Sequence, residues 1–312
     1  MSSEKNLQEY INKLKKRVPK NLVIEKVTDK NIQIANDYLK NQDKDKLEFK
    51  FSPVLSHFGN NWNYQDFPLG YIMRNTNNNS ILGFLGTICS KRRLNNVEVI
   101  CCNLVHWYVE KKFRIYAYAF FFPLLEKKII INATTPRNSI MGLYKKFNFE
   151  IKITKYTAGF SINFNSFFSK DYKRFEIITK DEEINNTLNY SDKKIHQDHK
   201  NYNCLNFVII DKKQELEPCF FVTKKSTWHY ITVLNILYAS NFKQYKQYAS
   251  EIFTNISLKY KILFIGQRYF NNLEKFEYSP ALLTKTVDKF FVIKTYDNHY
   301  ISDVLYSDLV MF

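Results

Sequence analysis

The spacing of apolar residues in the first half of the chain predicts strands and helices in a definite order. The expected strands are residues 22–27, 70–74, 81–90, 97–109, 128–133 and 149–154. The expected helices are residues 7–18, 31–41, 113–127 and 138–147. The turn formers at 75–80 join two of the strands as a hairpin. The predicted order after the first helix is β-α-loop-β-β-β-α-β-α-β.

The same kind of pattern partly repeats in the second half. The expected strands there are residues 204–211, 219–223, 231–239 and 260–265, and the expected helix is 243–256. A strand, a short turn, a helix and a strand follow one another in both halves, which indicates a tandem repeat of one fold. We therefore predict an α/β protein in which each domain has a mixed sheet flanked by helices. The expected boundaries are 1–166 and 204–312, with a polar junction at 167–203.

A segment rich in turn-forming residues interrupts the first half at 53–70. Pro, Gly and Asn residues alternate there with aromatic side chains. Aromatic loops of this kind often line a ligand. We expect His57, Trp62 and Tyr64 to contact a substrate.

Composition and charge narrow the class of protein. Hydrophobic residues make up 45% of the 312 positions, which is too apolar for a disordered chain. The net charge of +16 favours an anionic partner, either nucleic acid, an anionic membrane or a phosphate-rich small molecule. A lysine-rich codon bias would also explain the charge. Basic residues are scattered rather than blocked, which argues against nucleic acid.

Cysteine usage and hydropathy indicate a reducing compartment. Five cysteines, of which only Cys101 and Cys102 are close together, do not make a disulfide framework. The amino-terminal residues contain no apolar core of a signal peptide. The longest apolar run, 115–125, is too short to cross a bilayer, which takes about 20 residues. We expect a cytoplasmic protein without membrane insertion, either a monomer or a dimer.

Two histidines near the middle of the chain are the only hint of a metal. His196 and His199 are three residues apart, with Asp198 between them. No cysteine or further carboxylate stands at a zinc-ligand spacing. We therefore predict no metal and assign these residues to the polar junction.

Two short segments carry a resemblance to a known family. Residues 114–119 read RIYAYA, and residues 142–150 read GLYKKFNFE. In these segments the chain resembles the GNAT superfamily of acyl-CoA N-acyltransferases, whose signature is R or Q-x-x-G-x-G or A, followed downstream by LYxKLGF. Ala117 stands in place of one signature glycine. Asn148 replaces the glycine of the second segment, where a left-handed helix C-cap is needed and Asn is the second choice after Gly.

The resemblance implies that the first half binds an acyl-CoA, either acetyl-CoA or 3-hydroxybutyryl-CoA. The pyrophosphate would lie at the first turn of the helix, where backbone N–H groups and the helix dipole attract anions. Val109, at the end of the preceding strand, would pair by main chain with the pantetheine arm. The implied cofactor-binding residues are Val109, Arg114, Ile115, Tyr116, Ala117, Tyr118, Ala119 and Asn138.

Tyr144 matches the residue that serves as the general acid in the family. There it would protonate the departing thiolate of coenzyme A. The alternative is a core tyrosine on an amphipathic helix.

The residue that takes the proton from the amine is less defined. His106 is the nearest titratable side chain, and the alternative is a buried structural histidine. Strand alternation places Asn103, Val105 and Trp107 on one face and Leu104, His106 and Tyr108 on the other, unless a bulge changes it. We expect Asn103 to position the substrate, with His57 as a second candidate for the base.

The wider arrangement resembles tandem GNAT proteins of capsule and O-antigen biosynthesis. It implies a dTDP- or UDP-linked amino sugar as the acceptor and nucleotide sugars as partners. The second half, whose turn at 241–250 lacks the signature, would have lost coenzyme A binding and would contribute to the acceptor site. Two alternatives remain open at this point: a protein or peptide N-acetyltransferase, and a nucleic-acid-binding protein without enzymatic activity.

Overall fold

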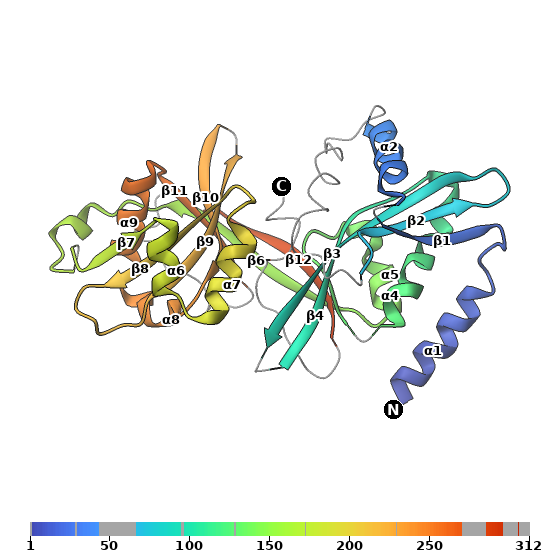
Figure 1. Cartoon of the computed structure of the whole chain (residues 1–312), viewed down its shortest axis with the longest axis horizontal. Helices are drawn as coiled ribbons and strands as arrows, with labels where there is room; N and C mark the ends of the chain where they lie inside the picture. Colours follow the sequence, from blue (N-terminus) through green and yellow to red (C-terminus); the bar gives the residue numbers. More distant parts are fainter. Residues whose placement is uncertain are drawn as a thin grey trace. The chain divides into compact units, whose positions relative to one another are not determined.

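A computed structural model describes most of the chain as two units. The described residues are 2–28, 30–43, 67–94, 97–127, 129–171, 173–228, 230–269, 285–295 and 305. Unit 1 comprises Met1–Lys152, Phe291–Tyr300 and Tyr306–Phe312, and unit 2 comprises Ile153–Phe290 and Ile301–Leu305 (Figure 1). The predicted substrate residues His57, Trp62 and Tyr64 lie outside the described residues.

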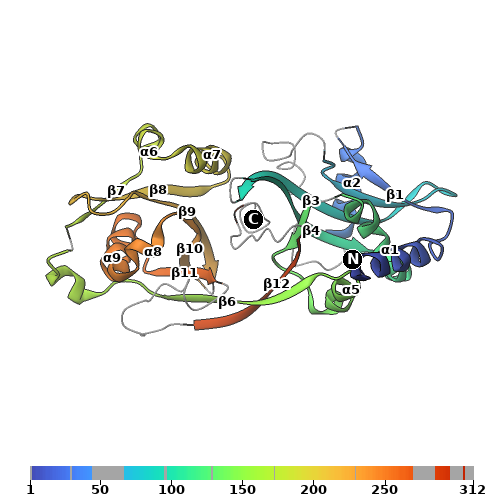
Figure 2. The ribbon, with the colours of Figure 1, turned by 90° about the horizontal axis from the view of Figure 1, so that it is seen from below.

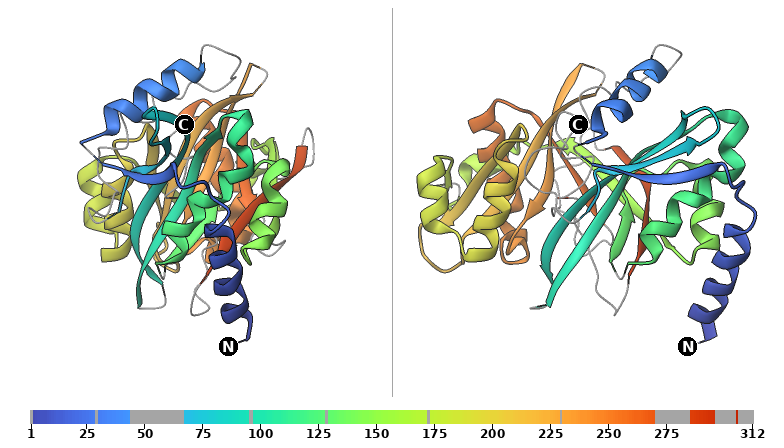
Figure 3. Two further views of the ribbon diagram at one scale, coloured as in Figure 1. Left: turned by 90° about the vertical axis from the view of Figure 1, so that its right-hand side faces the viewer. Right: turned by 45° about the vertical axis from the view of Figure 1, so that its right-hand side comes forward.

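The strands of unit 1 follow the order β1-β2-β3-β4-β5-β12, in which β12 belongs to unit 1 from Phe291 onward. Its strands are β1 (Leu22–Val27), β2 (Gly70–Asn75), β3 (Ser80–Leu94), β4 (Val97–Val109), β5 (Ile130–Ala133) and β12 (Lys285–Lys294). Neighbours pair antiparallel except β4 and β5, which are parallel. The long β3–β4 hairpin is prominent in both views of Figure 3.

Helices connect and cover these strands. They are α1 (Ser2–Lys15), α2 (Ile32–Asp43), η1 (Lys111–Phe121), α4 (Phe122–Leu125), η2 (Asn138–Ile140) and α5 (Met141–Lys146). The predicted α-helix at 113–127 is wrong in type, because most of it winds as the tighter 3₁₀ helix η1. Pro123 then lies in the first turn of α4, where its missing N–H leaves no helical bond unmade.

Unit 2 repeats this topology, which confirms the predicted tandem fold. Its sheet order is β6-β11-β10-β9-β8-β7, again with a single parallel pair, β10 with β11. The strands are β6 (Glu150–Phe160), β7 (Phe175–Ile178), β8 (Cys204–Asp211), β9 (Cys219–Trp228), β10 (Ile231–Ala239) and β11 (Phe264–Tyr269). The helices are η3 (Phe164–Phe168), α6 (Asp181–Thr187), α7 (Tyr190–His199), α8 (Phe242–Tyr245), η4 (Lys246–Tyr248) and α9 (Ala249–Tyr260).

The segment 167–203, expected as a junction, contains β7, α6 and α7 of unit 2. These helices lie on the side of β8 opposite to α8 and α9 (Figure 2). The buried side of α7 is polar: the Asp192 carboxylate accepts a hydrogen bond from the Tyr238 hydroxyl at 2.9 Å. Apolar periodicity misses such a helix, because hydrogen bonds rather than hydrocarbon contacts hold this part of it on the sheet.

The strand that flanks the parallel pair comes from an unexpected place in the sequence. In unit 1, β5 pairs with residues Val292–Lys294 of β12, which come after the long segment Ile153–Phe290 of unit 2. In unit 2, β11 pairs with β6, which directly follows α5. The pattern of one half therefore does not contain all the strands of its own sheet.

A buried ion pair fastens the edge strand β7 to β8. The Arg174 guanidinium donates two hydrogen bonds to the Asp211 carboxylate, at 2.8 and 2.7 Å, and one to the Tyr248 hydroxyl. Both charged side chains are buried. The paired guanidinium is the main reason that the pKa of Asp211 falls to about 2.

We predict that Asp211→Asn lowers the free energy of unfolding by about 3 kcal/mol at neutral pH, since the buried guanidinium loses the carboxylate that accepts two of its hydrogen bonds and keeps only the more exposed carboxylates of Glu215 and Asp171. The folded-state pKa is depressed, so the contribution is complete above about pH 4 and is lost as the pH falls toward 2. Urea titrations of both proteins across this range measure it. A difference that stayed constant down to pH 2 would contradict the assignment.

Candidate functional site

The β4 strand contains a bulge at His106. Phe84 of β3 pairs with Tyr108, and Gly86 pairs with Val105, so two β4 residues stand opposite one β3 residue. His106 has a φ of 49°, in the left-handed region that residues other than glycine rarely adopt. Strain of this kind persists only where the surrounding structure holds it, and it concentrates at functional sites.

The bulge changes which side chains share a face. Leu104 and Trp107 both contact the hydrophobic core under η1 and α5. Tyr108 lies on the other face, with its ring 6.2 Å from that of Tyr38 on α2. The simple alternation is therefore wrong beyond Val105, and Trp107 lies on the opposite face from the one expected.

Two glycines of β3 make room for the bulge. A Cβ atom on Gly86 would lie 2.8 Å from Cγ2 of Val105, and one on Gly83 would lie 3.0 Å from the Tyr108 carbonyl oxygen. Real Cβ atoms do not approach other atoms as closely as the Gly86 distance requires. Glycine inside a strand often marks such a close backbone approach.

Beyond Asn103 the parallel strands β4 and β5 separate. Their last paired residues are Asn103 and Asn132, after which β4 continues to Val109 and β5 ends at Ala133. Within the described residues, no strand pairs with the β5-facing edge of β4 at 104–109. We call this opening, formed by 104–109, the following turn 110–114 and residues 133–138, the fork.

Buried polar atoms lie near the place where β4 and β5 stop pairing. Asn103 is only 1% exposed, and its amide nitrogen donates to the Asn132 carbonyl oxygen at 3.5 Å. Its Oδ1 atom and the Oγ atom of buried Ser90, on β3, have no hydrogen-bond partner among the described residues. Buried polar atoms in this state need an explanation, and a ligand that binds them is one. Ser90 was missed, although it is a polar residue within a strongly apolar strand.

The turn with the GNAT-like signature lies at the Val109 end of the fork, away from Asn103. The Nε atom of Arg114 donates to the carbonyl oxygen of Val109 at 3.1 Å, which anchors the guanidinium against the end of β4. Ile115 is exposed, and Tyr116, Ala117 and Tyr118 are partly buried. Ala119 is buried in the core, so its small side chain serves the packing of η1 on the sheet. Asn138 is exposed at the start of η2.

Tyr144 lies on α5 within a group of aromatic rings. Its ring centroid is 5.1 Å from that of Phe149, 5.6 Å from Phe121 and 6.1 Å from Trp107. Burial raises the pKa of the Tyr144 phenol well above its usual value. The phenol therefore stays protonated at neutral pH and is available as a hydrogen-bond donor.

The end of α5 confirms the predicted helix C-cap. Asn148 has a φ of 58°, and the N–H group of Phe149 donates back to the Tyr144 carbonyl oxygen at 3.1 Å. This bond pattern ends a helix with one left-handed residue. It also holds the Tyr144 backbone in place.

His106 is partly buried, and a carboxylate that the sequence did not single out lies four residues further on. Glu110 follows the last residue of β4, and its N–H group donates to the Leu82 carbonyl oxygen. Partial burial raises its pKa, against the opposing effect of Lys112. Glu110 lies at the Val109 end of the fork, whereas His106 lies between Asn103 and Val109.

In unit 2 the parallel strands β10 and β11 stay paired closer to the register shift than β4 and β5 do. The β10 strand also has a register shift, between Ile236 and Tyr238, but its parallel pairing with β11 continues up to Ile236. The hydroxyl of Tyr156 lies over Gly266 and donates to Asn235 Oδ1 at 2.6 Å. This contact lies within the paired part of β10 and β11, since Asn235 pairs with Gly266.

His196 and His199 lie on α7 of unit 2 and make structural contacts. His196 Nε2 lies 2.7 Å from Asp181 Oδ1, and its Nδ1 lies 3.0 Å from the Asn206 amide nitrogen. His199 is fully buried against backbone carbonyl oxygens. Among the described residues no group of three His, Cys, Asp or Glu side chains converges as metal ligands would. No helix in the described part of the chain is long and apolar enough to span a bilayer.

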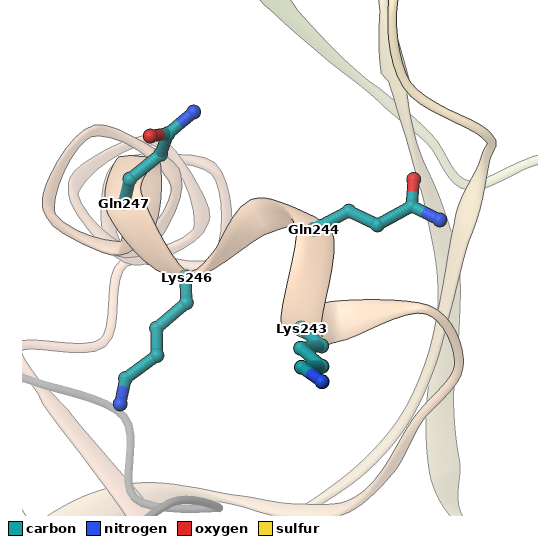
Figure 4. A pocket seen from close by; sticks show the side chains of 4 residues that line it. All are labelled: Lys243, Gln244, Lys246 and Gln247. Atoms are coloured by element: carbon teal, nitrogen blue, oxygen red, sulfur yellow. The ribbon is translucent and has the colours of Figure 1, made fainter.

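A separate surface hollow of about 450 Å³ lies on unit 2. Lys243, Gln244, Lys246 and Gln247 line it, and their side chains fan outward from α8 and η4 (Figure 4). It is open and cationic, and it follows β10 as the signature turn follows β4.

Solved structures share this fold at low sequence identity. A GCN5-related N-acetyltransferase from Anabaena variabilis has a TM-score of 0.55 and 13% identity, covering 87% of this chain and 72% of that one. A GCN5-related glucosamine N-acetyltransferase region of a fungal multi-domain GH3 β-N-acetylglucosaminidase has a TM-score of 0.56 and 8% identity, over 89% of this chain and 38% of that one. A GCN5-related N-acetyltransferase from Kribbella flavida gives 0.54 and 8%, over 87% and 70%.

Sequence comparison adds no relative: no protein-family model and no curated protein matches the chain. The structural similarity nevertheless agrees with the expected fold class. The chain has the fold of the GCN5-related N-acetyltransferases.

We predict that Gly86→Ala lowers the free energy of unfolding by about 1 to 3 kcal/mol, because the new methyl group overlaps Val105. Gly142→Ala is the matched control, since an added Cβ there meets no atom within 4 Å. Chemical denaturation of both variants measures the effect. Equal stabilities would show that the bulge tolerates a side chain opposite it.

Proposed function

We propose that the chain is an acyl-CoA-dependent N-acyltransferase whose fork binds the acyl-CoA. The observation that carries the proposal is the separation of β4 from β5 beyond Asn103, together with the bulge at His106. These features leave the main-chain donors and acceptors on the β5-facing edge of 104–109 without a strand partner in the described part of the chain. An extended ligand with amide groups, such as a pantetheine arm, pairs with an edge of this kind.

The turn beyond Val109 suits the phosphates of coenzyme A. Its first N–H groups begin the 11-residue helix η1, and the positive end of the helix dipole lies there. Lys111, Lys112 and Arg114 are exposed on this turn and add positive charge. Ala119, one of the implied cofactor-binding residues, is buried in the core, so its side chain has no contact with the phosphates in this proposal.

In the reaction, the amine nitrogen bonds to the thioester carbonyl carbon, the carbon–sulfur bond breaks, and the sulfur takes a proton as the amine loses one. Tyr144 is our candidate donor of the proton to sulfur. Burial that raises its pKa makes a lasting phenolate costly, so Tyr144 would act by hydrogen bonding and be reprotonated at once. His106, at the bulge, is our candidate for the base that receives the amine proton.

For the acceptor we propose an amino sugar. One structure with the same fold is described as a glucosamine N-acetyltransferase region. The buried oxygens of Asn103 and Ser90 suit the N–H and O–H donors of a sugar amine. The nucleotide part of a nucleotide-linked sugar, the capsule and O-antigen setting, and a cytoplasmic location stay predictions, as does an acceptor role for unit 2. None of the three similar structures is described as acting on a nucleotide sugar.

The test is calorimetry with acetyl-CoA, followed by thiol release with a panel of free and nucleotide-linked amino sugars. We expect acetyl-CoA binding without an acceptor and thiol release only with an amino sugar. Release with basic peptides alone would instead indicate a peptide N-acetyltransferase. Salt-sensitive nucleic-acid binding without any coenzyme A binding would reject the enzyme altogether.

We predict that Tyr144→Phe lowers kcat by roughly a hundredfold, within the usual range for loss of a general acid, and leaves the Kd for acetyl-CoA nearly unchanged. The ring contacts of Tyr144 survive in phenylalanine, so the fold should persist. Phe149→Leu, which disturbs the same ring group without removing a hydroxyl, is the matched control. An unchanged kcat in Tyr144→Phe would remove Tyr144 from the mechanism.

A further inference from the structure

The 3₁₀ helix η3 of unit 2 exposes three phenylalanine side chains. Phe168 is 90% exposed, Phe164 is 71% exposed and Phe167 is 38% exposed. The ring centroids of Phe164 and Phe167 are 6.4 Å apart. We call these three residues the phenylalanine patch. Single exposed apolar residues are ordinary, whereas a local group of large ones marks an interaction site.

Hydrogen bonds hold this segment firmly on α9. The Asn163 amide nitrogen donates to Ser250 Oγ at 2.7 Å, and the Asn163 N–H group donates to Thr254 Oγ1 at 3.0 Å. The hydroxyls of Ser166 and Ser250 lie 2.9 Å apart. The segment forms the yellow-green turn that projects beyond α9 at the edge of Figure 1. The patch is therefore presented by an ordered turn, so binding would cost little ordering entropy.

Exposed lysines follow the phenylalanine patch in the chain, and two further lysines precede the part of α9 that holds it. Lys170 and Lys173 follow η3 and are exposed. Lys243 and Lys246 line the surface hollow of Figure 4, and Ser250, four residues after Lys246, makes the bonds to η3 just described. Within the described residues, no carboxylate pairs with these four lysines. The nearby Asp171 already pairs with Lys213 at 3.4 Å and with Arg174 at 3.7 Å.

We propose that this end of unit 2 docks peripherally on an anionic lipid bilayer. The phenylalanine patch enters the boundary between headgroups and acyl chains, and the four lysines face the lipid phosphates. Reversible membrane binding commonly combines an apolar element with a basic one, because either alone is weak. This inference is independent of the fork and of the proposed acyltransfer.

Two other occupants fit the surface less well. A second copy of this chain, docked patch to patch, would bring lysines against lysines, and like charges at an interface oppose association. Single-stranded nucleic acid stacks its bases on successive aromatic faces. Phe164 and Phe167 are tilted by 42° to each other and provide no continuous platform.

The test is flotation of the full chain with phosphatidylcholine vesicles, with and without phosphatidylserine. We expect binding only with phosphatidylserine, weakened roughly tenfold or more in the double variant Phe164→Ser, Phe168→Ser. Tyr230→Ser removes a 100% exposed aromatic outside the patch and is the matched control. Lys170→Gln with Lys173→Gln should also weaken binding. Because all these side chains are exposed, thermal melts should be unchanged.

A second measurement separates insertion from simple charge attraction. In Phe168→Trp we expect a blue shift of the added tryptophan fluorescence on anionic vesicles, and quenching by brominated acyl chains. Undiminished vesicle binding by the Phe double variant, or no blue shift, would overturn the proposal. So would a patch-dependent dimer in sedimentation, or patch-dependent RNA binding without vesicle binding.

Discussion

The candidate site depends on one local constraint, the extra residue that β4 accommodates at His106. The bulge places a non-glycine residue in the left-handed region, and β3 tolerates it because Gly86 and Gly83 place no Cβ atom against Val105 and the Tyr108 carbonyl oxygen. Beyond Asn103 the strand no longer pairs with β5, so its β5-facing edge and the signature turn belong to one opening, with the buried Oδ1 atom of Asn103 where it begins. A β-bulge often serves in this way, by ending a ladder next to a site.

Unit 2 builds the same topology with different contacts around its parallel strands. Its β10 strand is also irregular, yet pairing with β11 reaches Ile236 and the Tyr156 hydroxyl lies over Gly266. Burial raises the pKa of that phenol to about 12, so it remains a neutral hydrogen-bond donor to Asn235. The repeated fold supports a second sheet and core there, while its surface carries the phenylalanine patch and the lysines. The two units therefore offer different chemistry on one architecture, as fold alone does not specify function.

Tyr144 combines a structural position in the core with a candidate catalytic role. It is a buried core tyrosine, with aromatic neighbours on several sides, and it also stands at the end of a short helix fixed by the Asn148 cap. The packing positions the ring, and the raised pKa keeps the phenol protonated. Its burial therefore does not decide between a structural and a catalytic role; the Tyr144→Phe measurement does.

Local pattern alone determined much of the fold. The alternation of 22–27, 97–109, 204–211 and 231–239 matches β1, β4, β8 and β10 residue for residue, and the C-cap at Asn148 follows from the short-range need for a left-handed residue. The tandem repeat and the signature turn after β4 are also visible in the sequence, because neighbouring residues build them.

Only the tertiary structure decided the rest. The bulge at His106 needs the glycines of β3, and the two sheets borrow β12 and β6 from distant positions. The polar face of α7 is held by partners on other elements. Each of these depends on contacts between residues far apart in the chain, which apolar periodicity does not encode.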